Sequence, residues 1–441
     1  MKNGIGILLV LLLEFPLLGA QNTAPQTLAN LRTELEAIKA DYDERISALE
    51  AQIEQLQIQM LRASAEPTVQ PVVAPASPVA YNALNPAISV VANFLGRIDN
   101  QPIFNEDGAR IDDTMNLREV EIDLRVPVDP YADAVLIVAF ESETPGSFET
   151  GIEEGYVNIK KLPFMESPLG LKFQIGRFRP AFGKFNILHT HDLPQATRSL
   201  TTQEFLGEEG FIQQGVSADF FVPTPWDDSA SLNARLQVLG GGDVALAPEA
   251  NQRLAYVGNL RWFRSHGDSH STDIGWSSYV RPGTTEHPVA RMHALDFLYR
   301  WKPLRQGQWK SYLLGGELML ADHARPDAAE PADVAEIIDP ANVRADGGRP
   351  IGFSVFTQWQ FDRRKYGGVR WDDTSTLRDP SIRRRGLTPY ISYYFSEFLR
   401  LRFNFEHRWS DIAVEDGRNS FLVELNWLFG SHPPEPFWVN R

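Results

Sequence analysis

The sequence of 441 residues contains no cysteine. This absence excludes disulfides, thiolate metal sites, nucleophilic thiol chemistry and a lipid attached to an N-terminal cysteine. Beyond residue 20 no apolar run approaches the ~20 residues that a membrane-spanning helix needs, so any contact with a membrane interior must come from strands. We find no phosphate-binding glycine loop, nucleophile elbow or HExxH helix, so we expect no enzyme and no cofactor. A hydrolase with Ser and His on an outer rim is the remaining enzymatic alternative.

Basic residues are outnumbered by acidic ones. Lys and Arg total 42 while Asp and Glu total 57, which gives a formal charge of −15. Nucleic-acid binding depends on a basic patch that faces phosphates, so we expect no nucleic-acid partner. Acidic loops are the simpler explanation of the charge.

The first twenty residues have the pattern of a secretory signal peptide. Lys2 precedes a mostly apolar run from Ile5 to Leu18, and the small pair Gly19-Ala20 follows. The run is too short for a membrane-spanning helix and Glu14 interrupts it, so cleavage after Ala20 is predicted rather than anchoring.

A helical coiled coil is predicted for residues 21–62. Apolar residues recur at three-four spacing from Leu28 to Met60, with charged residues between them. One narrow stripe cannot bury itself, so we expect a homo-oligomer through residues 28–60, a trimer by analogy. The alternative is a solvated helix packed on its own chain. Residues 63–84 include four prolines by residue 80 and are predicted to be an extended linker.

From residue 85 to residue 430 the pattern changes to a period of two. Polar residues from Arg400 to Glu406 alternate with apolar ones from Leu399 to Phe405, and similar runs surround Ile122 and Phe297. A buried core cannot hold so many charges. The pattern fits either a soluble sandwich with polar outer faces or a barrel with lipid outside and a polar lumen inside.

The connections favour the barrel. About sixteen strands are predicted, starting near Asn85, Leu117, Ala134, Thr150, Leu169, Phe211, Leu232, Leu254, Thr272, Met292, Trp309, Ile351, Lys365, Leu387, Leu399 and Phe421. Tight turns alternate with long polar segments, as in outer-membrane barrels with short periplasmic turns and long external loops. The fold class is therefore all-β, a transmembrane antiparallel barrel behind an α-helical coiled coil. Residues 431–441, rich in proline, cannot continue the last strand and are predicted to be a periplasmic tail.

Several short motifs strengthen this interpretation. They are Asn85-Pro86-Ala87-Ile88-Ser89, Gly176-Arg177-Phe178, Phe182-Gly183-Lys184, His189-Thr190-His191, Leu193-Pro194, Gly207-Glu208-Glu209-Gly210 and Gly267-Asp268-Ser269-His270-Ser271. With them the chain resembles porin-like Gram-negative outer-membrane β-barrels that carry an N-terminal coiled coil, variously described as phosphate-selective-porin-like or zinc-regulated TonB-dependent receptor-like. The resemblance implies a barrel in the outer membrane. It fits energised transport poorly, because sixteen strands leave no room for the plug of a 22-stranded receptor.

The expected function is passive diffusion of small hydrophilic solutes or ions through a water-filled lumen, with outer-membrane lipid around the barrel. The alternatives are a structural outer-membrane anchor or spacer, and a receptor for metal or substrate uptake. The predicted pore-lining residues are Arg125, Lys172, Arg261, Arg300, Arg400, Arg402, Asp123, Asp296 and Glu406. Basic side chains in a confined lumen act on ions at short range, so we expect a weak preference for anions despite the acidic chain.

The segment from Pro180 to Gly210 is the third long loop, at the position where general porins fold a loop into the lumen. Its candidate constriction residues are Lys184, His189, His191, Asp192, Arg198 and Glu204. The alternative is an external cap without a filtering role.

Two histidine groups are candidate metal sites. His189 and His191 point the same way in an extended segment, and His266 and His270 flank a predicted periplasmic turn at the other end of the barrel. Such groups are more often solvent-facing or hydrogen-bonded. We therefore expect no bound metal, with His189 and His191 as weak candidates.

Overall fold

The computed structural model describes residues 86–104, 109–142, 144–240, 253–283, 289–305, 307, 309–322, 348–431, 436, 438 and 439. The predicted signal peptide, coiled coil and linker lie outside these residues. In the described part, no helix has the length and apolar character that crossing a membrane requires.

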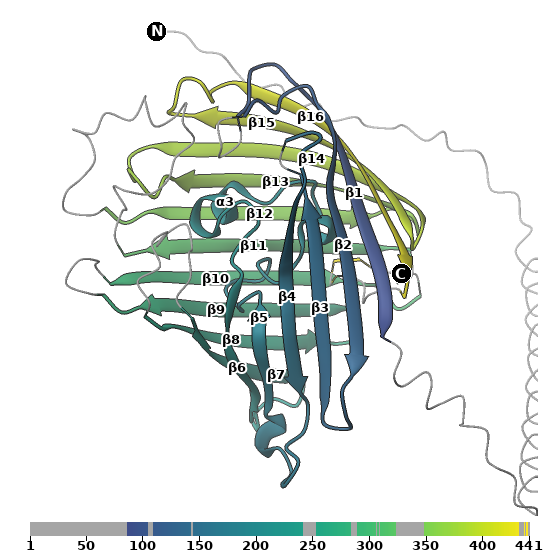
Figure 1. Ribbon diagram of the computed structural model, residues 1–441, viewed down its shortest axis with the longest axis vertical. Helices are drawn as coiled ribbons and strands as arrows, with labels where there is room; N and C mark the ends of the chain where they lie inside the picture. The colour runs from purple at the N-terminus through teal and green to yellow at the C-terminus, as the bar shows by residue number, and fades with distance from the viewer. Residues whose placement is uncertain are drawn as a thin grey trace, which may run out of the picture. The chain divides into compact units, whose positions relative to one another are not determined.

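Sixteen strands form a closed antiparallel barrel within the described residues (Figure 1). They are β1 (Ala87–Asp99), β2 (Met115–Pro127), β3 (Ala132–Glu141), β4 (Glu149–Ile159), β5 (Lys172–Phe178), β6 (Gln213–Val222), β7 (Ala230–Leu239), β8 (Ala255–His266), β9 (His270–Arg281), β10 (Ala290–Trp301), β11 (Ser311–Ala321), β12 (Ile351–Gln360), β13 (Lys365–Ser375), β14 (Arg383–Ser396), β15 (Leu399–Ser410) and β16 (Arg418–Gly430). The predicted all-β barrel of about sixteen strands is confirmed.

Each strand pairs with its neighbours in the chain, and β1 pairs with β16 to close the ring. The observed starts lie within four residues of those predicted, and the largest difference is at β14, which begins at Arg383 rather than near Leu387. Because the strand number is even, β1 starts and β16 ends at the same end of the barrel. We call this the terminal end, and the opposite end, with most of the long connections, the loop end.

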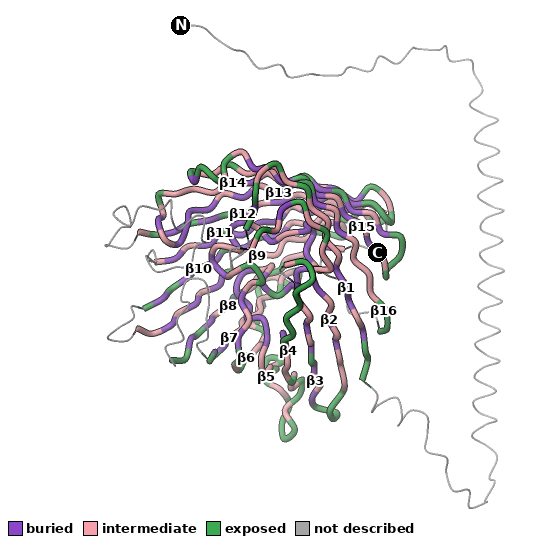
Figure 2. The backbone as a smooth tube through the Cα atoms, turned by 45° about the horizontal axis from the view of Figure 1, so that its top comes forward, coloured by how far each residue is buried: buried purple, intermediate pink, exposed green. Residues whose placement is uncertain are grey.

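The two faces of the wall differ as the alternation predicts. Along β15 the side of Leu401 and Phe405 is half-buried or exposed, while Arg400, Arg402 and Glu406 on the other side are at most 6% exposed (Figure 2). Large apolar side chains are exposed on strands around the ring; they include Ile152, Val216, Leu236, Tyr256, Trp276, Leu295, Phe353, Ile391, Phe405 and Phe421. The barrel is therefore apolar outside and polar within.

Three short helical elements interrupt the connections. They are η1 (Pro168–Gly170), η2 (Thr190–Asp192) and α3 (Leu200–Leu206). The last two belong to the connection between β5 and β6, residues 179–212, and α3 lies inside the ring of strands in Figure 1. We call residues 179–212 the lumen loop.

Candidate functional site

The lumen loop is bonded to inward side chains of one wall. The amide of Ala181 donates to Gln237 of β7 at 2.9 Å, and that of Gly183 donates to Ser277 of β9 at 3.1 Å. The amide of Phe185 donates to Glu317 of β11 at 2.9 Å. Because such contacts require the backbone to lie within the ring, the loop folds inward rather than capping the barrel from outside.

The same loop is held by the opposite wall. Arg370 of β13 donates to the carbonyl of Thr197 at 2.7 Å. On β15, Arg400 donates to the carbonyl of His191 and Arg402 to that of Leu193, at 2.5 and 2.6 Å. The loop therefore crosses the lumen and is bonded to the wall on both sides.

Local sequence explains how the loop turns inside the barrel. Gly183 has a φ of +69°, and a Cβ there would come 2.6 Å from a carboxylate oxygen of Glu317. Only glycine combines that backbone conformation with so close an approach. Farther along, the Ser199 hydroxyl accepts from the amide of Thr202 and caps α3. The side chain of Arg198 donates to the carbonyl of Leu188 at 2.8 Å and ties the two halves of the loop together.

Apolar side chains fix the loop on both of its flanks. One buried cluster joins its Phe182 and Phe205 to Tyr279 and Met292 of the wall. The second joins loop residues to β10–β14 and to the C-terminal tail; its buried members are Leu188, Leu193, Leu298, Leu313, Phe356, Tyr366, Tyr394 and Trp438. The loop is therefore packed as a core element and not only bonded through its backbone.

Trp438 of the tail lies inside the barrel. It is fully buried, and its indole nitrogen donates to the carbonyl of Asp192 at 2.5 Å. The guanidinium carbons of Arg400 and Arg402 lie 5.5 and 5.9 Å from its ring centroid. The prolines of the tail predict a periplasmic segment, and its sequence carries no signal for these contacts. The C-terminal tail therefore supplies a residue, Trp438, that supports the lumen loop.

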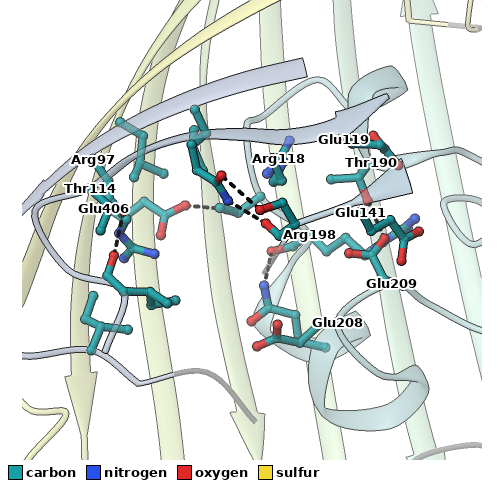
Figure 3. A pocket seen from close by; sticks show the side chains of 18 of the residues that line it. Arg97, Thr114, Arg118, Glu119, Glu141, Thr190, Arg198, Glu208, Glu209 and Glu406 are labelled. Atoms are coloured by element: carbon teal, nitrogen blue, oxygen red, sulfur yellow. Dashed lines mark hydrogen bonds between the residues drawn. The ribbon is translucent and has the colours of Figure 1, made fainter. Parts of the chain in front are cut away.

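A cavity lies on each side of the loop. The loop-end cavity, about 220 Å³, is lined by charged side chains of both signs, among them Arg97, Arg118, Glu119, Arg198 and Glu406 (Figure 3). The terminal-end cavity, about 590 Å³, is lined by Arg125, Lys172, Arg235, Glu154 and Asp192, with other residues. Thr190 lines the first cavity and its neighbour His189 lines the second. Residues 189–191 thus lie where the two cavities approach each other.

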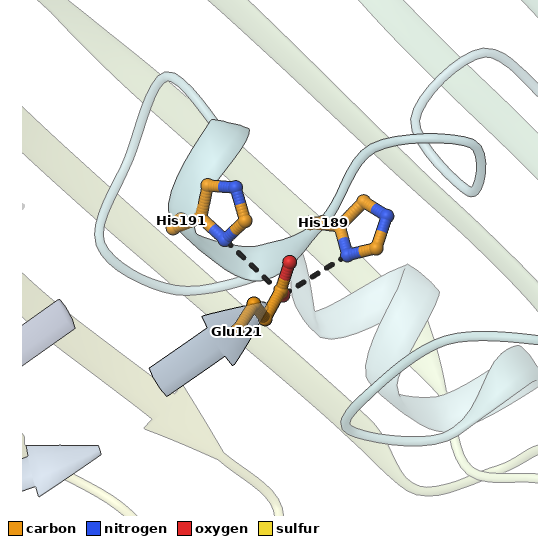
Figure 4. Close-up of side chains that lie close together, drawn as sticks. All are labelled: Glu121, His189 and His191. Atoms are coloured by element: carbon orange, nitrogen blue, oxygen red, sulfur yellow. Dashed lines mark hydrogen bonds and ion pairs between the residues drawn. The ribbon is translucent and has the colours of Figure 1, made fainter. Parts of the chain in front are cut away.

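At this partition the two imidazoles meet carboxylates from β2 and β4. The Nδ1 atoms of His189 and His191 lie 3.0 and 3.3 Å from the same oxygen of Glu121 (Figure 4). Glu153 lies 3.2 Å from His189 Nδ1, and Glu119 lies 3.4 Å from His191 Nδ1. All of these residues are at most 8% exposed. We call these residues, together with Glu154, the carboxylate–histidine cluster; its members are Glu119, Glu121, Glu153, Glu154, His189 and His191.

The cluster has a strong negative field around its histidines. Burial by itself lowers the pKa of both rings, but the facing carboxylates, Glu121 first, outweigh it and raise the pKa of His189 and of His191 well above the usual value. Glu153 is also ion-paired with the buried Arg179. The partition therefore favours a positive charge at the imidazole nitrogens.

The predicted pore-lining residues all lie on the inner side of the wall, in different settings. Arg125 pairs with Asp123 and, with Lys172, lines the terminal-end cavity. Arg261 pairs with Asp296 beneath the loop, and Arg300 lines a separate cavity at the terminal end. Glu406 accepts from Thr197 and lines the loop-end cavity. Arg400 and Arg402, by contrast, are covered by the loop and Trp438, so they support the loop instead of facing an open lumen.

The predicted constriction residues all lie within the barrel. Lys184 pairs with Asp273 at 2.5 Å, and Glu204 pairs with Arg384 at 2.6 Å. Asp192 lines the terminal-end cavity, and Arg198 lines the other one. The histidines lie in the partition between the two cavities.

His266 and His270 lie elsewhere. They flank the turn between β8 and β9 at the terminal end, where His266 contacts Thr272 and His270 contacts Tyr299. His189 and His191, in the connection that folds into the lumen, therefore share no site with His266 and His270. No sequence pattern identifies Glu153 and Glu154 as site residues. These lie next to each other on β4, where the strand register shifts and both are buried.

No family model matches the chain. An uncharacterized protein of Aquifex aeolicus (strain VF5) is 24% identical in an alignment of 365 positions, and the match covers 73% of this chain and 70% of that protein. Among solved structures, an anion-selective porin from Comamonas acidovorans is 9% identical, covers 78% of this chain and 99% of its own, and has a TM-score of 0.48. The outer membrane channel DcaP of Acinetobacter baumannii is also 9% identical, with coverages of 78% and 97% and a TM-score of 0.48.

Proposed function

We propose that the chain is a porin-like outer-membrane channel for the passive diffusion of small hydrophilic solutes or ions, with the lumen loop as its constriction. The observation that carries the proposal is the inverted arrangement of the barrel. Apolar side chains are exposed on its outside, while charged side chains surround two cavities inside. A soluble protein gains nothing from this distribution, but it suits a wall with lipid on one side and water on the other.

The inner charges support weak ion selectivity. The loop-end cavity is lined by five Arg residues and five Glu residues. The terminal-end cavity is lined by five basic residues and four acidic ones, besides His189. Fixed charges of both signs at short range offset each other in their effect on a permeating ion. A weak preference for anions is therefore retained, but it is assigned to the cavity residues and no longer to Arg400 and Arg402.

Orientation and assembly are part of the same proposal. The terminal end faces the periplasm, where residues 21–62 form a coiled coil after removal of the signal peptide, residues 1–20. The even number of strands supports this, because both chain ends then leave on one side. The heptad seam supports a trimer, since its apolar stripe needs partner helices.

Purified full-length protein in a planar bilayer tests the proposal. We expect stepwise increases in conductance, with a reversal potential close to zero in a salt gradient and displaced slightly toward anion preference. A correctly folded barrel that inserts but gives no conductance above the empty bilayer would refute the channel.

A second candidate is a structural outer-membrane anchor, with the coiled coil as a periplasmic spacer. One observation favours it: the lumen loop and Trp438 pack against β10–β14 as a buried core. Deletion of residues 21–62 distinguishes the two. Defects in envelope spacing with conductance intact would favour a structural role in addition to the channel, and a silent barrel with the same defects would favour the anchor alone.

A further inference from the structure

We propose that the partition between the two cavities is a binding site for a divalent transition-metal ion, with Glu121, His189 and His191 as its ligands. Their donor atoms all lie within 4.8 Å of one another. Figure 4 shows the two imidazoles of the loop directed at one carboxylate of β2 from two sides. The ligands therefore come from separate elements that the fold brings to one point.

The spacing of the donors suits a metal ion. Nitrogen and oxygen donors lie ~2.0–2.2 Å from zinc, so two donors of a tetrahedral site are about 3.3 Å apart. The Nδ1 atoms of His189 and His191 lie 3.0 and 3.3 Å from the Glu121 oxygen. Two of the three donor–donor distances therefore already match those of a bound zinc ion, and all three lie within 4.8 Å.

A second carboxylate orients one of the ligands. His189 Nε2 lies 2.8 Å from Glu154 Oε1. Metal-binding histidines typically donate their other ring N–H to a carboxylate in this way, which fixes the tautomer and leaves the facing nitrogen free for the metal. With the proton on Nε2, the lone pair of Nδ1 faces oxygens of Glu121 and Glu153. A cation between them turns this repulsion into attraction.

The charge of the cluster favours a dication. Glu119, Glu121, Glu153 and Glu154 are all at most 7% exposed, and Arg179 pairs with Glu153. Each Nδ1 atom faces two carboxylate oxygens, although a single N–H can donate fully to only one of them. A metal ion can attract all of them at once. The cluster therefore supplies more acceptors than two protons can satisfy.

The donor set selects the class of ion. Two imidazoles with carboxylates suit Zn²⁺, Co²⁺ or Ni²⁺, whereas Ca²⁺ and Mg²⁺ prefer oxygen ligands alone. Three protein ligands leave a fourth position for water or for Glu119 or Glu153. Bound there, the ion links the lumen loop to β2 at the partition between the two cavities.

Metal binding to the purified full-length protein tests this site directly. The protein in detergent is treated with a chelator and dialysed against Zn²⁺, and the bound metal is measured. We expect one Zn²⁺ per chain, with His189→Gln and His191→Gln each weakening binding at least 100-fold. Glu154→Ala should weaken it about 10- to 100-fold, because it removes only the carboxylate that orients His189. The matched control, His266→Gln with His270→Gln, should bind as the unmutated chain does.

X-ray absorption at the zinc edge keeps the test independent of any variant's folding. The unmutated chain should show imidazole scattering from two histidines in a shell of N/O donors at ~2.0–2.1 Å. No zinc retained at micromolar concentration, a shell without imidazole, or binding lost only in the His266/His270 control would each overturn the site in favour of a charged imidazole–carboxylate cluster. Conductance plays no part, so a silent barrel that binds zinc leaves the metal site standing, and a conducting barrel without zinc leaves the channel standing.

Discussion

Replacing Trp438 with alanine tests whether the C-terminal tail holds the lumen loop. The side chain is fully buried, its indole nitrogen is bonded to the Asp192 carbonyl, and Gln358 donates to its own carbonyl at 3.0 Å. Truncating a buried tryptophan costs ~3–5 kcal/mol. The strands keep their pairing in this variant, so we expect the loss to fall on the loop and not on the barrel.

The expected effect is faster local opening of the loop. At ~1.4 kcal/mol for each tenfold change, the loss corresponds to opening about 100- to 4,000-fold more often. Hydrogen exchange reports it, because the amides of Leu188, Asp192 and Leu193 are hydrogen-bonded within the loop. Single-channel conductance should rise as well, since a detached loop obstructs the lumen less.

The control is Trp226→Ala, because Trp226 is 73% exposed in the turn between β6 and β7. It should leave both the exchange and the conductance unchanged. If peptides covering residues 185–193 exchange at the same rate in Trp438→Ala as in the unmutated chain, the reasoning that the tail supports the loop is refuted.

Three further predictions concern buried pairs and cavity charges. Arg402→Gln breaks the fully buried ion pair with Glu424, whose charged atoms lie 2.7 Å apart, and should lower the free energy of unfolding in guanidinium by ~3–5 kcal/mol. The double variant Arg402→Met with Glu424→Met should recover most of that loss. Equal losses in the two variants would contradict this prediction. Arg125→Gln with Lys172→Gln should move the reversal potential toward cations, and no shift would place the terminal-end cavity off the ion path. Asp112 accepts from Arg110, which lowers the pKa of that carboxyl to about 2. Its stabilisation of residues 100–104 and 109–114 should therefore hold above about pH 4 and disappear as the pH falls through 2. Hydrogen exchange measures this step, and Asp112→Asn is the control that should lack it.

The strands could be predicted because their signal is local. On β15 the alternation of apolar and polar residues from Leu399 to Glu406 indicates which side chains face the lumen, and no long-range information is required. The long connection after β5 could likewise be recognised by its length and its charges. The direction in which it folds depends on contacts with Gln237, Glu317 and Arg402, which no local pattern specifies.

Only the histidines of the carboxylate–histidine cluster could be predicted. The spacing of His189 and His191 is visible in the sequence, but their partners are distant in the chain. Glu121 lies 68 residues before His189, and Glu154 lies 35 before it. Their meeting depends on strand register and on the path of the loop together. Trp438 shows the same limit, because a single tryptophan beyond the last strand carries no signal that it returns to the interior.

Thiol labelling of a cysteine placed at the loop tests the central claim most directly. The chain has no cysteine of its own, so only an introduced thiol reacts. Asp192 belongs to the loop, lines the terminal-end cavity and has a side chain that is 33% exposed, whereas Val128 is exposed in the turn between β2 and β3. In a planar bilayer, a charged methanethiosulfonate reagent should reduce the current through Asp192→Cys and leave that through Val128→Cys unchanged. An unchanged current through Asp192→Cys, with mass spectrometry showing the cysteine modified, would contradict a pathway past the lumen loop.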